Sequence, residues 1–213
     1  MTPVQLLVIA KAPEPGRVKT RLCPPCTPQQ AADIAAAALS DTLTAAGATP
    51  AVRHTVVLSG RYPVPRGWLT VTQRGDGLAH RLANGFTDTA LPRVGSLLVG
   101  MDTPHLTPAL LDEVAAGLRE ADAVLAPAED GGWWALALRD PHHADALRPV
   151  PMSTPHTAQW TVDALRARGL RLGYGPVLRD VDTAADALTV AATCAPGAFT
   201  HAVRAHLAPA GTR

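Results

Sequence analysis

Residues 4–21 read VQLLVIAKAPEPGRVKTR, and this stretch decides the fold class that the chain can adopt. Residues 4–10 form a near-continuous apolar run, which is typical of a strand buried on both faces of a parallel sheet. The loop that follows contains Pro13, Pro15 and Gly16 and carries four cations within eleven residues. The stretch therefore predicts a buried strand that delivers a basic loop to the carboxyl edge of its sheet.

Strands and helices alternate along the rest of the chain. Apolar runs predict strands over residues 54–59, 68–72, 95–101, 121–126 and 133–138. Fourfold apolar spacing and helix caps predict helices over 28–46 and 78–90, from near 108 and 155, and at the C-terminus. This alternation favours an α/β fold, a three-layer α/β/α sandwich with a mostly parallel sheet. No repeat or linker divides it, so one domain is expected over residues 1–213.

Two of these helices carry more specific predictions. Leu78, Leu82 and Phe86 recur at fourfold spacing, so we expect them on one buried helix face. Ser153 or Thr154 is expected to cap the helix that begins near Pro155.

Composition limits the partners and the compartment. The chain has 213 residues, 47% of them hydrophobic, with a formal net charge of +1, which gives no support for a nucleic-acid or membrane partner. The apolar run at the N-terminus lacks a basic region before it and is too short to span a bilayer. Three cysteines are too few for a disulfide framework and fit a reducing compartment. We therefore expect a cytoplasmic protein, monomeric or homodimeric, with small-molecule partners.

Cys23 and Cys26 have the spacing of a redox or zinc half-site. Structural zinc needs a second ligand pair, and the chain has no second cysteine pair. The two prolines between them favour a plain loop position, with a redox or metal role as the alternative.

The basic loop is the first candidate site. Gly16 lets the backbone approach an oxyanion closely, and Lys11, Arg17, Lys19 and Arg21 supply point charges and planar forks that suit phosphate. The segment is neither a P-loop nor a dinucleotide fingerprint. The alternative is a solvated basic loop, but the position after the first strand favours phosphate binding.

Carboxylates form the other candidates. Asp102 follows a buried strand and is expected to bind Mg²⁺, or else to satisfy backbone donors at a helix start. Glu129 and Asp130 precede two glycines, which indicates either a tight turn that leaves space for a bulky substrate or a reverse turn with solvated acids. Asp180 and Asp182 are expected to add a carboxylate to the metal or to cap the next helix. Of the tryptophan pair that follows the glycines, strand alternation places one in the core and one on the opposite face.

Together these groups resemble a known family. It comprises small GT-A-like transferases assigned to arsenosugar biosynthesis or to radical-SAM and selenodomain systems, related to phospholactate guanylyltransferase and, distantly, to molybdenum-cofactor guanylyltransferases. The stretches that carry the resemblance are AKAPEPGRVKTRL (10–22), QRGDGLAHRL (73–82), LLVGMDTPHL (97–106), APAEDGGWWALAL (126–138), MSTPHTAQWTVDAL (152–165) and RDVDTAADAL (179–188).

The resemblance implies a nucleotide-diphospho-sugar transferase (GT-A) fold that binds a nucleotide with Mg²⁺ or Mn²⁺. It implies catalytic roles for Lys19, Asp102 and Asp130. The residues it implies for nucleotide binding are Lys11, Gly16, Arg17, Lys19, Arg21, Gln73, Gly75 and Arg81. Asp102, joined by Asp182, is the implied metal site, and Asp130 with Gly131 forms the acceptor-side turn.

The chain departs from the family pattern at two places. His105 stands where relatives carry a second acid, which leaves Asp102 with less local help and makes Asp182 the candidate to compensate. Trp133 and Trp134 stand where a tyrosine pair is usual, which suggests a larger or more apolar acceptor wall.

Three functions are consistent with these residues. The preferred one is a nucleotidyltransferase that moves NMP from an NTP to a small phosphate- or phosphonate-bearing acceptor and releases pyrophosphate. The second is a glycosyltransferase that uses an NDP-sugar, with Asp130 or Glu129 as base. The third is a non-catalytic nucleotide-binding protein, which the histidine at position 105 motivates. The basic loop favours the first, because a triphosphate carries more charge than a sugar diphosphate.

Overall fold

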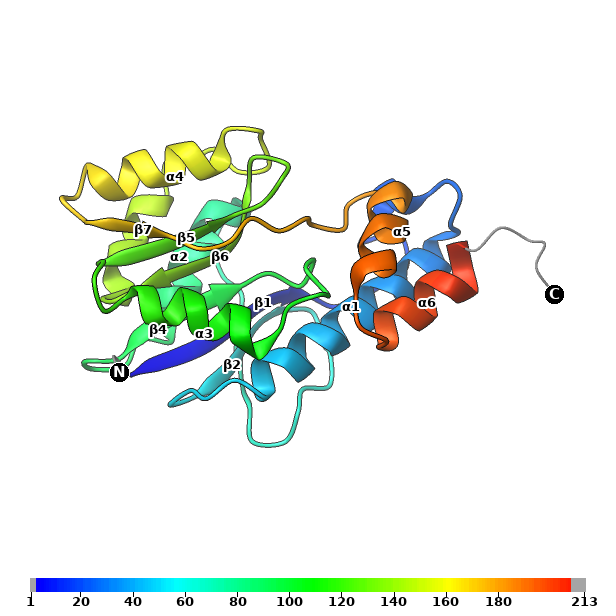
Figure 1. The fold of residues 1–213 in the computed structure, drawn as a ribbon, viewed down its shortest axis with the longest axis horizontal. Coiled ribbons are helices and arrows are strands. Elements are labelled where there is room, and N and C mark those ends of the chain that lie inside the picture. Colours follow the sequence, from blue (N-terminus) through cyan, green and yellow to red (C-terminus); the bar gives the residue numbers. More distant parts are fainter. Residues whose placement is uncertain (1–2, 208–213) are drawn as a thin grey trace.

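A seven-stranded sheet forms the centre of the molecule in a computed structural model, which describes residues 3–207 (Figure 1). Its strands are β1 (Val4–Lys11), β2 (His54–Ser59), β3 (Leu69–Thr72), β4 (Gly95–Val99), β5 (Ala123–Pro127), β6 (Trp133–Leu138) and β7 (Leu172–Tyr174). They lie in the order β3-β2-β1-β4-β6-β5-β7. Only the two pairings that involve β6 are antiparallel, so the prediction of a mostly parallel sheet is confirmed.

Helices cover both faces of the sheet. The α-helices are α1 (Pro28–Gly47), α2 (Gly77–Asp88), α3 (Pro108–Gly117), α4 (Thr157–Arg166), α5 (Ala184–Thr193) and α6 (Ala198–Leu207), and the 3₁₀ segments are η1 (Thr20–Leu22) and η2 (Pro141–Leu147). On one face α1 and α3 pack against the sheet, and on the other α2, η2 and α4 do. The three-layer arrangement is therefore as predicted. In the described part of the chain, no helix has the length and hydropathy needed to cross a bilayer.

Strand β1 shows why the sheet needs two layers of helices. Leu6 and Val8 belong to the core shared with α1 and α3, whereas Leu7 belongs to the core on the α2 face. Successive side chains of a strand point to opposite faces, so a continuous apolar run must be covered twice. The same alternation sends Trp134 into the first core and Trp133 towards the second, which confirms the prediction for this pair.

The C-terminal helices form a third apolar cluster beside the sheet. Figure 1 shows α5 and α6 packed against the N-terminal half of α1, away from the strands. Asp41 of α1 accepts hydrogen bonds from the backbone N–H groups of Ala198 (3.0 Å) and Phe199 (2.8 Å), so its carboxylate satisfies the first turn of α6. The sequence predicted one final helix here, and the structure contains two.

Two local predictions were wrong in detail. Leu82 and Phe86 are buried as expected, but Leu78 is 46% exposed because it stands in the first turn of α2, at the mouth of a cleft. Helix α4 begins at Thr157 rather than near residue 155, with His156 at its N-cap and neither Ser153 nor Thr154 as the cap. The physical reason is a tight turn, in which the Thr157 hydroxyl accepts from the Thr154 N–H (3.1 Å) before the helix starts.

Candidate functional site

A cleft of about 900 Å³ opens at the carboxyl edge of β1 and β4. These neighbouring strands form the topological switch point of the sheet, because the chain continues from β1 to β2 and β3 on one side and places β4 on the other. Ligands of open α/β sheets bind in the crevice at such a point. Lys11 at the end of β1 and Asp102, three residues beyond β4, both line the cleft.

The cleft brings together most of the residues that the sequence predicted. They are Lys11, Arg17, Lys19, Arg21, Gln73, Arg81, Asp102, Asp130 and Asp182. Gly16 and Gly75 are not among the lining residues and instead shape the loops behind it. Gly75 has a φ of +107°, and a Cβ there would lie 2.8 Å from that of His80, so this turn can pack on α2 only as glycine.

Lys19 forms ion pairs with two of the carboxylates that line the cleft. Its ammonium nitrogen is 2.7 Å from Asp102 Oδ1 and 3.1 Å from Asp182 Oδ1, and only 9% of the side chain is exposed. Its backbone is left-handed, with a φ of 46°. Burial acts to lower the pKa of Lys19, but the attraction of the two carboxylates outweighs it, so the pKa is raised above its usual value. Lys19 is therefore a charged bridge between the end of β4 and the segment that precedes α5.

Two arginines of the basic loop form exposed ion pairs. Arg17 pairs with Glu14 (2.7 Å) and Arg21 with Asp182 (3.3 Å), and both arginines are more than two-thirds exposed. Exposed pairs of this kind contribute little to stability, because water and salt screen the two charges. A phosphate that enters the cleft can therefore replace these carboxylates at little cost.

Lys11 and Arg81 differ from the other cations of the cleft. Lys11 donates to the carbonyl oxygen of Arg17 (2.9 Å), and Arg81 donates to that of Gly75 (3.3 Å). Neither forms an ion pair with a carboxylate of residues 3–207. Their charges are thus available to an anionic ligand without the loss of an existing salt bridge.

Asp180 is the functional candidate that the sequence ranked too low. It lines the cleft beside Asp102, and the Thr103 hydroxyl donates to its Oδ1 (3.0 Å). Burial and the negative charge of Asp102 raise the pKa of Asp180 to about 6. The alternative that Asp180 or Asp182 caps the next helix is wrong, because Thr183 is the N-cap of α5 and Asp186 completes its capping box.

The carboxylates fit a cation that is shared between protein and ligand. No group of three metal-ligating side chains is assembled among the described residues. Magnesium is often held by one or two carboxylates together with substrate phosphates and water. Asp102 and Asp180 provide such a pair. A divalent cation would offset the negative charge of Asp102, which, after burial, is the second cause of the raised pKa of Asp180. The oxygens of Asp182 already accept from Lys19 and Arg21, so its predicted role as a metal ligand remains a prediction.

The turn between β5 and β6 also contributes to the lining of the cleft. Asp130 lines the cleft, and its Oδ1 accepts from the Gly132 N–H (2.8 Å). Gly131, with a φ of +87°, packs so tightly against Pro155 that a Cβ would lie 2.0 Å from the proline oxygen. Glu129 is not among the lining residues and pairs with Arg179 (2.5 Å). Of the two acids in this turn, the cleft therefore receives only Asp130.

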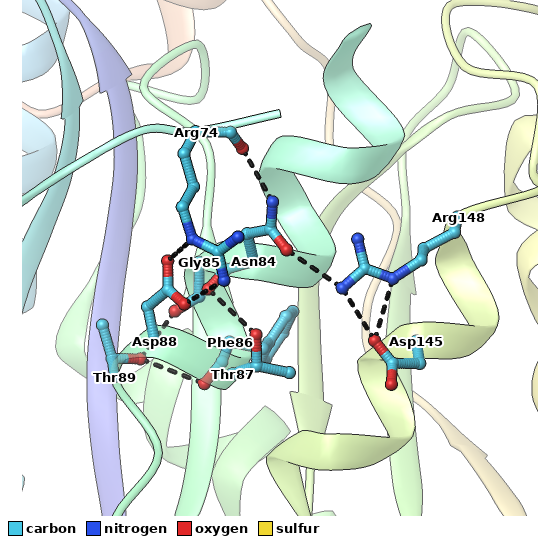
Figure 2. Close-up of polar contacts among 9 residues, drawn as sticks. All are labelled: Arg74, Asn84, Gly85, Phe86, Thr87, Asp88, Thr89, Asp145 and Arg148. Atoms are coloured by element: carbon cyan, nitrogen blue, oxygen red, sulfur yellow. Dashed lines mark hydrogen bonds and ion pairs between the residues drawn. The ribbon is translucent and has the colours of Figure 1, made fainter. Parts of the chain in front are cut away.

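The buried side-chain amide of Asn84 holds the loop that follows β3 in place. Figure 2 shows Asn84 of α2 between two arginines: it donates to the Arg74 carbonyl oxygen (2.9 Å) and accepts from the Arg148 guanidinium (2.9 Å). Arg74 also forms a bidentate pair with Asp88. Gln73 donates to the carbonyl oxygens of residues 10 and 57, which holds the loop to β1 and β2. Sequence reasoning missed Asn84, although a poor helix former inside a predicted helix was a signal.

The segment that contains Cys23 and Cys26 is a turn between η1 and α1. Cys26 is buried in the cluster formed with α5 and α6, and both thiols are free. The predicted loop position of this segment is therefore confirmed, and the alternative of a redox or metal role stays a prediction.

The raised pKa of Asp180 predicts a pH-dependent stability. An unfolded aspartate titrates near pH 3.9, so between about pH 4 and pH 6 the folded protein retains a proton that the unfolded chain releases. This contribution to stability is present at low pH and is lost as the pH rises through about 6. Asp180→Asn keeps an acceptor for Thr103 but cannot titrate. Urea unfolding should show the variant gaining about 2–3 kcal/mol on the wild type between about pH 4 and pH 7.

A suitable control is Asp112→Asn, because Asp112 is exposed on α3. Its stability relative to the wild type should change little with pH. A difference between Asp180→Asn and wild type that is constant across this range would contradict the raised pKa.

The fold is that of GT-A-like nucleotidyltransferases and nucleotide-diphospho-sugar transferases. The chain belongs to the family described as "Uncharacterized protein conserved in bacteria (DUF2064)", whose model matches residues 26–154. This range contains Asp102 and Asp130 but neither the basic loop nor Asp180. No curated protein matches the sequence.

Solved structures support the assignment of the fold. A proposed nucleotide-diphospho-sugar transferase from Desulfovibrio desulfuricans G20 is 25% identical, with a TM-score of 0.75 over 87% of this chain and 85% of that one. Rv0371c from Mycobacterium tuberculosis H37Rv, in complex with manganese, is 18% identical, with a TM-score of 0.56 over 89% and 98%. CMP:2-keto-3-deoxy-manno-octonic acid synthetase in complex with CTP is 12% identical, with a TM-score of 0.58 over 88% and 96%.

Proposed function

We propose that the protein is a metal-dependent nucleotidyltransferase that moves NMP from an NTP to a phosphate or phosphonate group of a small acceptor. The observation that carries the proposal is the convergence of five cations and the Asp102–Asp180 pair on one cleft at the switch point of the sheet. The five cations are Lys11, Arg17, Lys19, Arg21 and Arg81. One protein with a similar fold has been solved in complex with CTP and another in complex with manganese, and both complexes agree with the proposal.

In this reaction an oxygen of the acceptor attacks the α-phosphorus of the NTP, and the bond from that phosphorus to the bridging oxygen of pyrophosphate breaks. The transfer needs mainly positioning and charge neutralisation, so it requires no nucleophilic side chain. Asp102 and Asp180 would hold Mg²⁺ or Mn²⁺, which supplies positive charge to the phosphates. Lys11 and Arg81 bind the phosphate oxygens, and Lys19 neutralises the charge that develops on the leaving pyrophosphate.

Two further lining residues suit an acceptor. Asp130 lies on the turn after β5, and Trp133 of β6 also lines the cleft. A cleft of about 900 Å³ is at the upper end of the range for small-molecule sites, which leaves room for a nucleotide and a small acceptor together. In this proposal Asp130 orients the acceptor rather than the nucleotide.

One observation favours glycosyl transfer from an NDP-sugar as a second candidate. Asp130 faces the cleft without an ion-pair partner in residues 3–207, as a base towards an acceptor hydroxyl would. The D. desulfuricans protein is also named for nucleotide-diphospho-sugar transfer. In that case Asp130, and not Glu129, would be the base.

A non-catalytic role rests on His105. Burial lowers the pKa of His105, and its side chain is not among those that line the cleft, so it does not replace the second acid that the family resemblance implies at this position. Asp180 supplies a second carboxylate from another segment, which weakens this alternative.

Calorimetric titration with each NTP and with common NDP-sugars, with and without Mg²⁺, tests the proposal. Metal-dependent binding of one NTP, followed by pyrophosphate release in the presence of phosphorylated or phosphonate acceptors, would support it. Preference for an NDP-sugar would move the assignment to glycosyl transfer. Binding without turnover over a broad acceptor panel would favour the non-catalytic role, and no nucleotide binding at all would refute all three.

A further inference from the structure

Lys19 occupies a place that is unusual for a phosphate-binding lysine. Such lysines extend towards the ligand, whereas the Lys19 ammonium is turned back between Asp102 Oδ1 (2.7 Å) and Asp182 Oδ1 (3.1 Å). The side chain is nine-tenths buried, but each carboxylate is about 40% exposed. The lysine therefore sits beneath two acids whose outer sides are open to the cleft.

A divalent cation bound to Asp102 would lie next to the Lys19 ammonium. Asp102 is one of the two carboxylates that fit Mg²⁺ or Mn²⁺, and such an ion binds oxygen at about 2.1 Å. An ion on this carboxylate would lie within a few ångströms of the ammonium, where repulsion between unscreened charges is strong. The ammonium and a divalent cation thus compete for Asp102.

We propose that Lys19 is a built-in counter-cation, whose ammonium keeps divalent metal off Asp102 until nucleotide phosphates enter the cleft. The inference rests on the proposed function, because the phosphates supply the second set of negative charges that both cations then share. With phosphate present, the ammonium turns from the carboxylates to the phosphate oxygens, and the metal binds Asp102. Metal and nucleotide therefore bind together, and metal alone binds weakly.

The backbone at this position supports such a change of partner. Lys19 is one of only three non-glycine residues with positive φ in the described chain, with φ 46° and ψ 39°. A left-handed conformation is unfavourable for a residue that has a side chain. The ion pairs with Asp102 and Asp182 hold Lys19 in this strained conformation. A phosphate ligand would therefore replace ion pairs whose benefit is partly offset by backbone strain.

The test measures the binding of Mn²⁺ alone, without nucleotide, from the electron paramagnetic resonance signal of the free ion. The pH is set well above the pKa of Asp180, so that the carboxylates are ionised. Lys19→Met keeps the buried aliphatic stem and removes the charge, and it should bind Mn²⁺ at least about tenfold more tightly than the wild type. Lys19→Arg keeps the charge and should bind as weakly as the wild type. Lys11→Met removes a cleft cation that has no carboxylate partner among the described residues, and it should also bind like the wild type.

The result that overturns the inference is a folded Lys19→Met variant that binds Mn²⁺ no more tightly than the wild type. If Lys19→Met does not fold, as judged by circular dichroism, Lys19→Gln provides the same comparison. Calorimetry of the wild type with NTP and Mn²⁺ separates the two proposals. If NTP binds but Mn²⁺ affinity is the same in all the variants, only the counter-cation role fails, and if no NTP binds, the proposed function fails as well.

Discussion

Replacing Gly131 by alanine should lower the melting temperature by roughly 6–12 °C, which corresponds to about 3 kcal/mol in a domain of this size. Two effects add at this position. A residue with a side chain is strained at a φ of +87°, at a cost of about 1–2 kcal/mol. The new Cβ would also lie 2.0 Å from the backbone oxygen of Pro155, so the turn and the start of α4 must separate. Thermal unfolding followed by circular dichroism measures the change.

Gly169→Ala is the matched control for this prediction. Gly169 has a similar φ of +77°, but nothing lies within 4 Å of the position of its Cβ. It should therefore show only the backbone cost, about 1 kcal/mol or roughly 2–4 °C. Equal losses in the two variants would mean that the contact with Pro155 contributes nothing, and the account of this wall of the cleft would be wrong.

Asp102→Asn should lower kcat/KM of the proposed nucleotidyl transfer by about 10²–10³-fold or more. The variant removes the carboxylate that both Lys19 and the metal require, and preorganised charges of this kind are worth such factors in other active sites. It also leaves Lys19 with Asp182 as its one carboxylate among the described contacts, so some loss of stability is expected too. Activity is measured well below the melting temperature of the variant, by release of pyrophosphate from the preferred NTP.

Asp112→Asn again serves as the control, since this exposed aspartate of α3 does not line the cleft. Its kcat/KM should equal that of the wild type. Retention of most of the activity by a folded Asp102→Asn variant would exclude Asp102 from the catalytic role.

Much of the fold could be predicted because the signals were local. The apolar run over residues 4–10 required burial on both faces, and the alternation of such runs with helices left few arrangements other than a parallel sheet between two helical layers. The antiparallel orientation of β6 was harder to predict from the sequence. It depends on a tight turn between β5 and β6 that returns the chain beside β4. The error at the start of α4 arose because a turn formed by Thr154 and Thr157 precedes the helix.

The candidate site, like the fold, could be predicted only in part. Local sequence was enough to predict which residues make up the site: cations after the first strand, an aspartate after the fourth, and an acid beside paired glycines. These residues could be predicted because side chains that follow parallel strands meet at one edge of the sheet. How their charges pair with one another depends on the tertiary fold. Lys19 and Asp182 are separated by 163 positions in the chain, and their contact depends on the path that returns the segment before α5 to β4. The raised pKa of Asp180 likewise arises from burial and from Asp102, neither of which is a property of local sequence.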